Sequence, residues 1–247
     1  MELDSFHPSS IYTFFQSLAA ALYVGGMLYF LRNNFSLIKR VALIAASAAL
    51  VTPFASGISS LAGTSEGQSY FGALGAQIMG LVVFLKLSRS SASDRARVWK
   101  IFSILSGGIY ALLRIGCHFR GCCWGRICPY AWATFYRSQD VVTPWLFLPL
   151  HPVQLYSAIH GVVLSFVVAR YMRGPGLRYE SVNPAHALGV FLILMGAGRL
   201  ITDIFRADAA FYKQSWMGLY PNTVIAIAVL LSGAAIFLRS RQLLKSR

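Results

Sequence analysis

The stretch AHALGVFLILMGAGRLITDIF, residues 185–205, decides the fold. It is apolar over about 20 residues, the length that a helix needs to cross the hydrocarbon core of a membrane. Two charged residues, Arg199 and Asp203, stand near its end. A helix is the expected element, because an open strand would leave backbone polar groups unpaired in lipid. The stretch therefore predicts a membrane-spanning helix that carries charged side chains.

Six further apolar stretches lie along the chain, near residues 11–31, 41–62, 70–87, 101–117, 153–170 and 220–238. Those at 70–87 and 101–117 look short or interrupted, and Pro53 is expected to kink its helix or end a turn. The composition agrees with a membrane protein, since 56% of the 247 residues are hydrophobic and only 12% are charged. We predict an all-α polytopic bundle of seven transmembrane helices that forms one domain, residues 1–247. This composition excludes an ordinary soluble enzyme, a disordered chain and a small secreted disulfide protein.

The distribution of positive charge predicts the orientation. The net charge is +14, and most Lys and Arg residues fall in alternate connections and in the tail. Cytoplasmic loops collect such residues, so the N-terminus is expected outside and the C-terminus in the cytoplasm. No basic region precedes the first stretch, which is therefore expected to be an uncleaved anchor. We find no nucleic-acid motif and expect no nucleic-acid partner. The predicted cytoplasmic residues are Arg32, Lys39, Arg40, Lys86, Arg89, Arg95, Arg97, Lys100, Arg170, Arg173, Arg178, Arg239, Arg241, Lys245 and Arg247.

Arginines at membrane depth form the first candidate site. Arg199, Asp203 and Arg206 have the spacing that places them on one helix face, and Arg114 ends the fourth stretch. An arginine at this depth costs about 2.5–3.5 kcal/mol on insertion scales, so it usually faces a partner or a cavity. Asp203 supplies one negative charge for three arginines. An anionic ligand would supply the missing charge, and a phosphodiester suits the guanidinium fork. Snorkelling to lipid head groups is the alternative, and it suits Arg206 best.

The second polar cluster is HPVQLY, residues 151–156. Pro152 suits the first turn of a helix, which places His151 at the outer end of the bundle. Gln154 and Tyr156 lie in the same turn. The cluster is interpreted either as a helix cap with interfacial aromatics or as a group that orients a ligand or handles a proton.

All four cysteines lie between Cys117 and Cys128, in a segment whose glycines suggest a tight looping backbone. Three chemical interpretations stay open beside simple packing. A disulfide, such as Cys117 with Cys122, would form in an oxidising compartment. A metal site with His118 is possible, although the spacing lacks paired CxxC motifs. Thiols activated by nearby arginines are the third.

Three motifs together resemble a known family. RIGCHFRGCCWG, residues 114–125, resembles the signature of the bacterial prolipoprotein diacylglyceryl transferases. HPVQLY, residues 151–156, is similar to the HPxQLY motif of that family. GRLITDIFR, residues 198–206, is similar to its late R-x-x-x-E-x-x-R helix. Order, spacing and seven spans also fit, and the resemblance covers most of the chain.

The chain departs from the family pattern at several polar positions. Cys117 stands where the family has Asn, and Cys122 where it has Glu. Asp203 replaces the late Glu. Phe71 falls where the family has a catalytic His, and Phe14 falls near a functional Tyr. The arginines that would grip a phosphate are kept, while several proton-handling groups are not.

The resemblance implies an enzyme that transfers diacylglycerol from phosphatidylglycerol, or a similar anionic membrane lipid, to the lipobox cysteine of a prolipoprotein, with release of glycerol phosphate. The leaving phosphate gains charge and needs fixed positive donors, for which Arg114 and Arg199 are the candidates with Arg206 in support. His151 is the candidate base for the attacking thiol, since Phe71 cannot act.

The remaining roles follow from the same resemblance. Asp203 would orient Arg199. The protein is expected in the bacterial cytoplasmic (inner) membrane, with no cofactor and no bound metal. The other predicted substrate-binding residues are Gln154, Tyr156, Gly116, Gly125, Cys117 and Cys122.

Three rival functions stay open. A divergent transferase could use another acceptor, with Cys122 or Cys123 in a covalent intermediate. A thiol redox protein could pass electrons to quinone, which explains the cysteines but not the arginines. A lipid-binding or transport protein would bind phospholipid without turnover.

Overall fold

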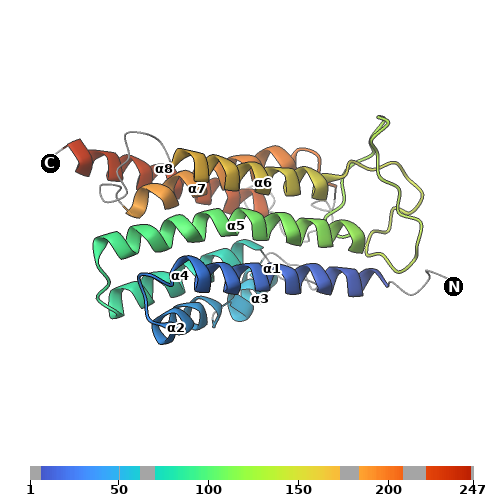
Figure 1. The fold of residues 1–247 in the computed structure, drawn as a ribbon. Helices are drawn as coiled ribbons and strands as arrows, with labels where there is room; N and C mark the ends of the chain where they lie inside the picture. The colour runs from blue at the N-terminus through green and yellow to red at the C-terminus, as the bar shows by residue number, and fades with distance from the viewer. Residues whose placement is uncertain (1–6, 50, 62–69, 173–183, 208–220, 246–247) are drawn as a thin grey trace.

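The computed structural model describes residues 7–49, 51–61, 70–172, 184–207 and 221–245. Their helices alternate in direction along the bundle (Figure 1). Seven segments are long and apolar enough to cross a membrane, and α2 runs on toward α3 as one of them, which confirms the predicted polytopic bundle. The helices are α1 (Pro8–Phe30), α2 (Leu37–Ala48), α3 (Val51–Leu61), α4 (Tyr70–Leu87), α5 (Ala92–Arg120), α6 (Val153–Tyr171), α7 (Pro184–Asp203) and α8 (Pro221–Lys245).

Helix α5 differs from the short or interrupted helix predicted near 101–117, which is wrong. It has 29 residues and begins at Ala92, because the Ser91 hydroxyl accepts a hydrogen bond from the Asp94 backbone N–H at 3.1 Å. Hydropathy misses this polar beginning. Gly107 does not break the helix either. It lies against α6, where a Cβ atom would meet the Gly161 carbonyl oxygen at 2.7 Å. Small residues of this kind let membrane helices approach closely.

The proline in the second span acts as the sequence predicts. Helix α2 ends at Ala48 and α3 begins at Val51, with Pro53 in its first turn. A proline ring collides with the carbonyl of the residue four positions earlier, here Ala49, the C-cap of α2. The span is therefore divided just before this proline.

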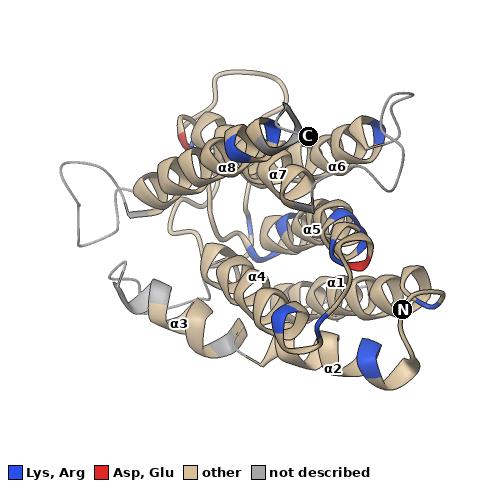
Figure 2. Ribbon diagram, turned by 90° about the vertical axis from the view of Figure 1, so that its left-hand side faces the viewer, with Lys and Arg blue, Asp and Glu red and all other residues tan. Residues whose placement is uncertain are grey.

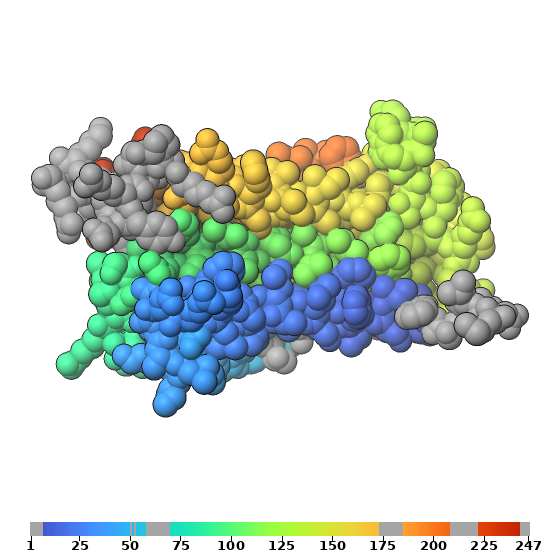
Figure 3. All heavy atoms as spheres, in the orientation of Figure 1, coloured from blue at the N-terminus to red at the C-terminus, as the bar shows by residue number. Residues whose placement is uncertain are grey.

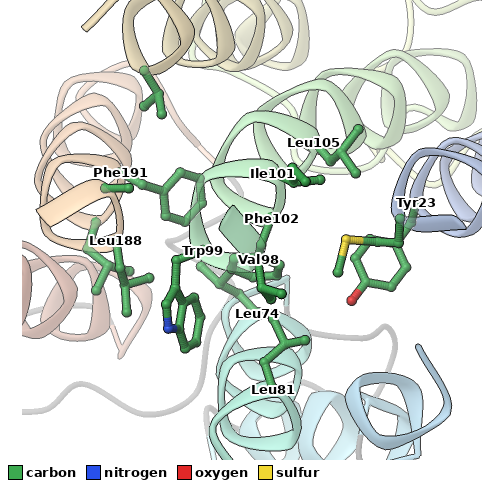
Figure 4. Packing of buried hydrophobic residues seen from close by; sticks show 14 of the residues in the cluster. Tyr23, Leu74, Leu81, Val98, Trp99, Ile101, Phe102, Leu105, Leu188 and Phe191 are labelled. Carbon is green, nitrogen blue, oxygen red and sulfur yellow. The ribbon is translucent and has the colours of Figure 1, made fainter. Parts of the chain in front are cut away.

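Helix α5 is the central helix of the bundle. It packs against α1, α6 and α7, while α8 packs on α7, and α4 packs on α2 and α3. Figure 1 shows α5 between a layer of α6, α7 and α8 and a second layer that holds α1 to α4. Figure 4 shows the core that joins these layers, built from Tyr23 of α1, Leu81 of α4, Phe102 of α5 and Phe191 of α7. Helix α5 is therefore held between α1 on one side and α6 and α7 on the other.

Positive charge gathers at one end of the bundle. Seen from the end where α5 begins, Lys and Arg residues lie at helix ends and turns (Figure 2). The predicted cytoplasmic residues Arg173, Arg178 and Arg247 lie outside the described part of the chain. At the opposite end α1 begins, α5 and α7 end, and α6 begins (Figure 1). By the positive-inside rule, this opposite end is predicted to face outward.

This orientation can be tested with two exposed serines. We expect a cysteine introduced as Ser138→Cys, in the segment between α5 and α6, to react in intact cells with a membrane-impermeant maleimide. A cysteine introduced as Ser93→Cys, in the first turn of α5, should react only after the cells are permeabilised. The unchanged chain gives the background from its own cysteines. If only the Ser93→Cys protein were labelled in intact cells, the orientation of the bundle would be the opposite of the predicted one.

Candidate functional site

A sharp turn ends α5 and starts the irregular segment, residues 121–152. Gly121 caps the helix with a φ of 70°, and its N–H donates to the His118 carbonyl at 3.2 Å. Glycine is the usual residue at this left-handed position. Cys123 also has a positive φ, 58°, which is uncommon for a residue with a side chain. The chain therefore bends twice within three residues. The sequence predicted looping there, but Gly116 lies inside α5.

Backbone hydrogen bonds attach this segment to the residues that follow α7, and a further bond joins its own two ends. The Arg126 N–H donates to the Phe205 carbonyl at 2.8 Å, and the Ala207 N–H donates to the Trp124 carbonyl at 3.1 Å. The His151 N–H donates to the Arg126 carbonyl at 2.9 Å. The approach is close at Gly125, where a Cβ atom would meet the His151 carbonyl oxygen at 2.3 Å. The segment thus covers one end of the bundle (Figure 3) and brings the three sequence motifs together.

The three candidate arginines are buried at this end. Arg114, Arg199 and Arg206 are 9%, 3% and 4% exposed. Asp203 Oδ1 lies 3.0 Å from Arg199 Nη2, as the helical spacing indicated, and 3.8 Å from Arg206 Nε. The predicted helix face does not include Arg206, because α7 ends at Asp203 and the chain turns before Arg206. The other Asp203 oxygen accepts a hydrogen bond from the Thr223 hydroxyl at 3.4 Å. One carboxylate is therefore shared by two guanidinium groups.

Arg114 approaches this pair from α5. Its Cζ lies 4.9 Å from the centre of the Tyr110 ring, and its Nη1 lies 3.3 Å from the Cys123 sulfur. It lies close enough to interact electrostatically with Arg206, and Tyr110 interacts with both Arg114 and Arg199. Tyr110 therefore stands between the arginines of two helices. In the described part of the chain, no carboxylate lies within ion-pair distance of Arg114.

Two polar groups beside these arginines are incompletely satisfied. Arg199 Nε is buried without a hydrogen-bond partner among the described residues, and the buried Tyr110 hydroxyl lies near Ser157 and Arg199 without a well-formed hydrogen bond. Buried polar groups are normally hydrogen-bonded, and leaving one unpaired costs about 1–3 kcal/mol. A bound anion with several oxygens would accept from both donors. The arrangement thus offers unpaired donors together with an excess of positive charge.

The cysteines lie beside Arg114. The Sγ atoms of Cys117, Cys122 and Cys123 are within 4.8 Å of one another. All four cysteines are free thiols, so the Cys117–Cys122 disulfide considered from the sequence is not formed. Hydrogen bonds from the Cys117 and Cys122 thiols, aided by the nearby charges of Arg206 and Arg114, hold the pKa of the Cys123 thiol well below its usual value. Cys128 is buried elsewhere in the segment.

Gln154 holds the cysteine turn in place. Its Nε2 donates to the Cys122 carbonyl at 2.7 Å and to the Tyr136 hydroxyl at 3.0 Å, and the residue is 1% exposed. Both amide protons are therefore used inside the protein. The structure gives Gln154 a positioning role, whereas the sequence suggested contact with a head group.

His151 and Tyr156 form a second group. The Tyr156 hydroxyl accepts a hydrogen bond from Trp132 Nε1 at 2.9 Å and lies 3.1 Å from His151 Nδ1. The hydroxyl oxygen has two lone pairs, so it can also accept from His151 Nδ1–H, and in that tautomer Nε2 keeps a free lone pair. The His151 ring packs on Phe205, the residue before Arg206, with ring centres 5.1 Å apart. The group adjoins the arginines through this contact.

Other predicted positions lie apart from the arginines. Gly116 faces α1, where a Cβ atom would meet Phe15 Cβ at 3.0 Å, so it serves helix packing. Phe71 packs on the apolar core, and Phe14 is exposed on α1. Neither Tyr110 nor Tyr136 could be predicted as a site residue from the sequence, because neither belongs to a motif or has a charge.

Seven candidate spans define a multi-pass membrane protein, and a buried, positively charged cluster lies at one end of its bundle. The family model described as prolipoprotein diacylglyceryl transferase matches residues 33–239, and the chain belongs to this family.

Curated relatives carry the name phosphatidylglycerol–prolipoprotein diacylglyceryl transferase. The protein from Brucella anthropi is 24% identical over 180 residues, which is 68% of this chain and 56% of the relative. The protein from Salmonella paratyphi B is 28% identical over 190 residues, which is 68% of this chain and 61% of the relative. The match thus covers about three fifths of the length of these relatives.

The shared carboxylate gives a test of the site. We expect Asp203→Ala to destabilise the protein by on the order of 3 kcal/mol, because the buried Arg199 loses its partner. Asp203→Glu should keep most of the stability. The readout is the temperature at which the monodisperse peak in detergent is lost.

Asp140→Ala is the matched control, since this exposed aspartate makes surface contacts alone, at 3.9 Å with His7 and at 3.1 Å with the Ser138 hydroxyl. It should melt like the unchanged chain. An Asp203→Ala protein that melts at the same temperature as this control would show that the carboxylate does not support the arginines.

Proposed function

We propose that this protein transfers a diacylglyceryl group from phosphatidylglycerol to the lipobox cysteine of a prolipoprotein, in the bacterial cytoplasmic membrane. Family membership supports the reaction class. The observation that carries the proposal is that three buried arginines lie at one end of the bundle, while the one carboxylate there pairs with only two of them, Arg199 and Arg206. A phosphodiester head group would supply the missing negative charge at membrane depth.

The arginines would act on the leaving group. When the bond between the sn-3 carbon and the phosphate oxygen breaks, negative charge gathers on glycerol phosphate. Arg114 and Arg199 are already buried and oriented, so they stabilise this charge without reorganisation. Asp203 fixes Arg199 at 3.0 Å, and the Tyr110 hydroxyl is a further donor beside it. Arg206 adds to the positive field.

The acceptor thiol must lose a proton before it attacks carbon. His151 is the proposed proton acceptor, because it is half-buried and its ring is oriented by Tyr156 and Phe205. A positive field from the arginines favours the thiolate. The new carbon–sulfur bond forms as the carbon–oxygen bond breaks, and the product is a thioether on the lipoprotein cysteine.

Arginine variants test this reaction. We expect Arg114→Ala and Arg199→Ala to lower transfer to a synthetic lipobox peptide by about 10²–10³-fold, the usual loss for a fixed donor at a developing oxyanion. The assay uses protein reconstituted in phosphatidylglycerol vesicles and follows both the lipidated peptide and released glycerol phosphate. Arg114→Lys should recover only part of the loss, since lysine has no planar fork.

Arg170→Ala is the control, because this exposed arginine ends α6 at the opposite end of the bundle. It should transfer at the unchanged rate. Full transfer in both the Arg114→Ala and Arg199→Ala proteins would refute the proposed roles. Stable binding of phosphatidylglycerol with no transfer by the unchanged protein would instead identify a lipid-binding protein.

A further inference from the structure

Three thiols meet at the turn after α5, and the proposed reaction gives them no chemical step. The Sγ atoms of Cys117, Cys122 and Cys123 all lie within 4.8 Å of one another. We propose that they bind one Zn²⁺ ion, with a fourth coordination position open to an incoming thiol. The second part rests on the proposed function, in which the acceptor is a cysteine.

The geometry suits a single ion. Zinc–thiolate bonds of about 2.3 Å in a tetrahedron place sulfur atoms about 3.8 Å apart. The three sulfurs therefore need to approach one another by no more than about an ångström, which cysteine side-chain rotation supplies. Thiolates are soft ligands and select zinc over hard cations such as magnesium.

The backbone explains how such unusual spacing reaches one point. Adjacent residues in an extended chain point to opposite sides, so Cys122 and Cys123 would normally diverge. The left-handed conformations at Gly121 and Cys123 remove this alternation and turn the chain back over the last turn of α5, which holds Cys117. Gln154 fastens the turn through the Cys122 carbonyl at 2.7 Å. The sequence could not show this arrangement, because the spacing has no CxxC pair.

The surrounding charge favours the loaded site. Three thiolates and one Zn²⁺ carry a net charge of −1, so the complex is an anion even though the ion is a cation. Arg114 Nη1 lies 3.3 Å from the Cys123 sulfur, and both Arg206 and Arg114 act electrostatically on Cys123. Positive charge of this kind stabilises an anionic zinc–thiolate group in a buried place. The cysteines and the arginines are thus electrostatically complementary.

The fourth coordination position of the zinc ion would connect this site to the proposed transfer reaction. Among the described residues, no further His, Cys, Asp or Glu ligand atom joins the three sulfurs. Structural zinc sites are closed by four protein ligands, whereas catalytic sites keep three and leave one position open. A thiol that binds there would give its proton to His151, the base of the proposed function, and would remain on the ion as a thiolate. It would then lie beside Arg114, whose Nη1 is 3.3 Å from the Cys123 sulfur.

Metal binding is tested on the full chain, purified in detergent with a reductant. After loading with Zn²⁺ and desalting, we expect one zinc ion per chain. Each single serine variant should retain at least about tenfold less zinc than the unchanged chain, because one ligand of the ion is lost. The three variants are Cys117→Ser, Cys122→Ser and Cys123→Ser. Cys128→Ser is the matched control, because Cys128 is buried in the same segment but does not belong to the three-thiol group. It should bind like the unchanged chain.

Cobalt gives a second readout that does not depend on any variant. Co²⁺ bound to three thiolates should give an intense near-ultraviolet charge-transfer band and tetrahedral visible bands. Addition of a lipobox peptide that contains cysteine should change the visible bands, whereas the same peptide with serine should not.

The outcomes separate this proposal from the proposed function. Less than about a tenth of a zinc ion on the reduced, unchanged chain would overturn the site. Equal zinc on the three cysteine variants would also overturn it. If the cobalt spectrum did not change when the cysteine peptide was added, the open coordination position would be refuted. One bound zinc ion with no diacylglyceryl transfer would leave the metal site standing and refute the proposed function.

Discussion

Positive charge buried without full compensation is the constraint on which the rest of this structure depends. Three buried guanidinium groups lie at one end of a membrane bundle, where ions are costly, and the one carboxylate beside them pairs with only Arg199 and Arg206. The end of α5, the segment after it and the ends of α6 and α7 all converge to hold this charge in place. The irregular segment crosses the bundle end because backbone bonds tie it to Phe205 and Ala207, just after α7. The proposed chemistry on an anionic lipid rests on that arrangement.

Much of the fold could be predicted from the sequence, because apolar length and charge position are visible there. The seven spans follow from hydropathy, and the pairing of Arg199 with Asp203 follows from helical periodicity. The length of α5 could not be predicted in the same way. Its first turns are polar and depend on the Ser91 cap, which a hydropathy pattern does not register. The division of the second span was visible because Pro53 has a fixed local effect.

The sequence pointed to those site residues whose burial in a membrane costs free energy, and it missed those of a type that is common in an apolar core. Arg114 stood out as a charge in lipid, whereas Tyr110 looked like any apolar aromatic until the fold placed it between two arginines. Whether the cysteines are paired or free depends on distances that spacing cannot give. Gln154 was found by its motif, but its bond to the Cys122 carbonyl gives it a different role.

Native mass spectrometry of the protein in a mixture of equal phosphatidylglycerol and phosphatidylcholine tests the central claim most directly. The account predicts that one phosphatidylglycerol stays bound per chain, that phosphatidylcholine does not, and that the selectivity disappears when Arg114 and Arg199 are both replaced by alanine. Equal retention of the two lipids, or unchanged selectivity in the double variant, would contradict it.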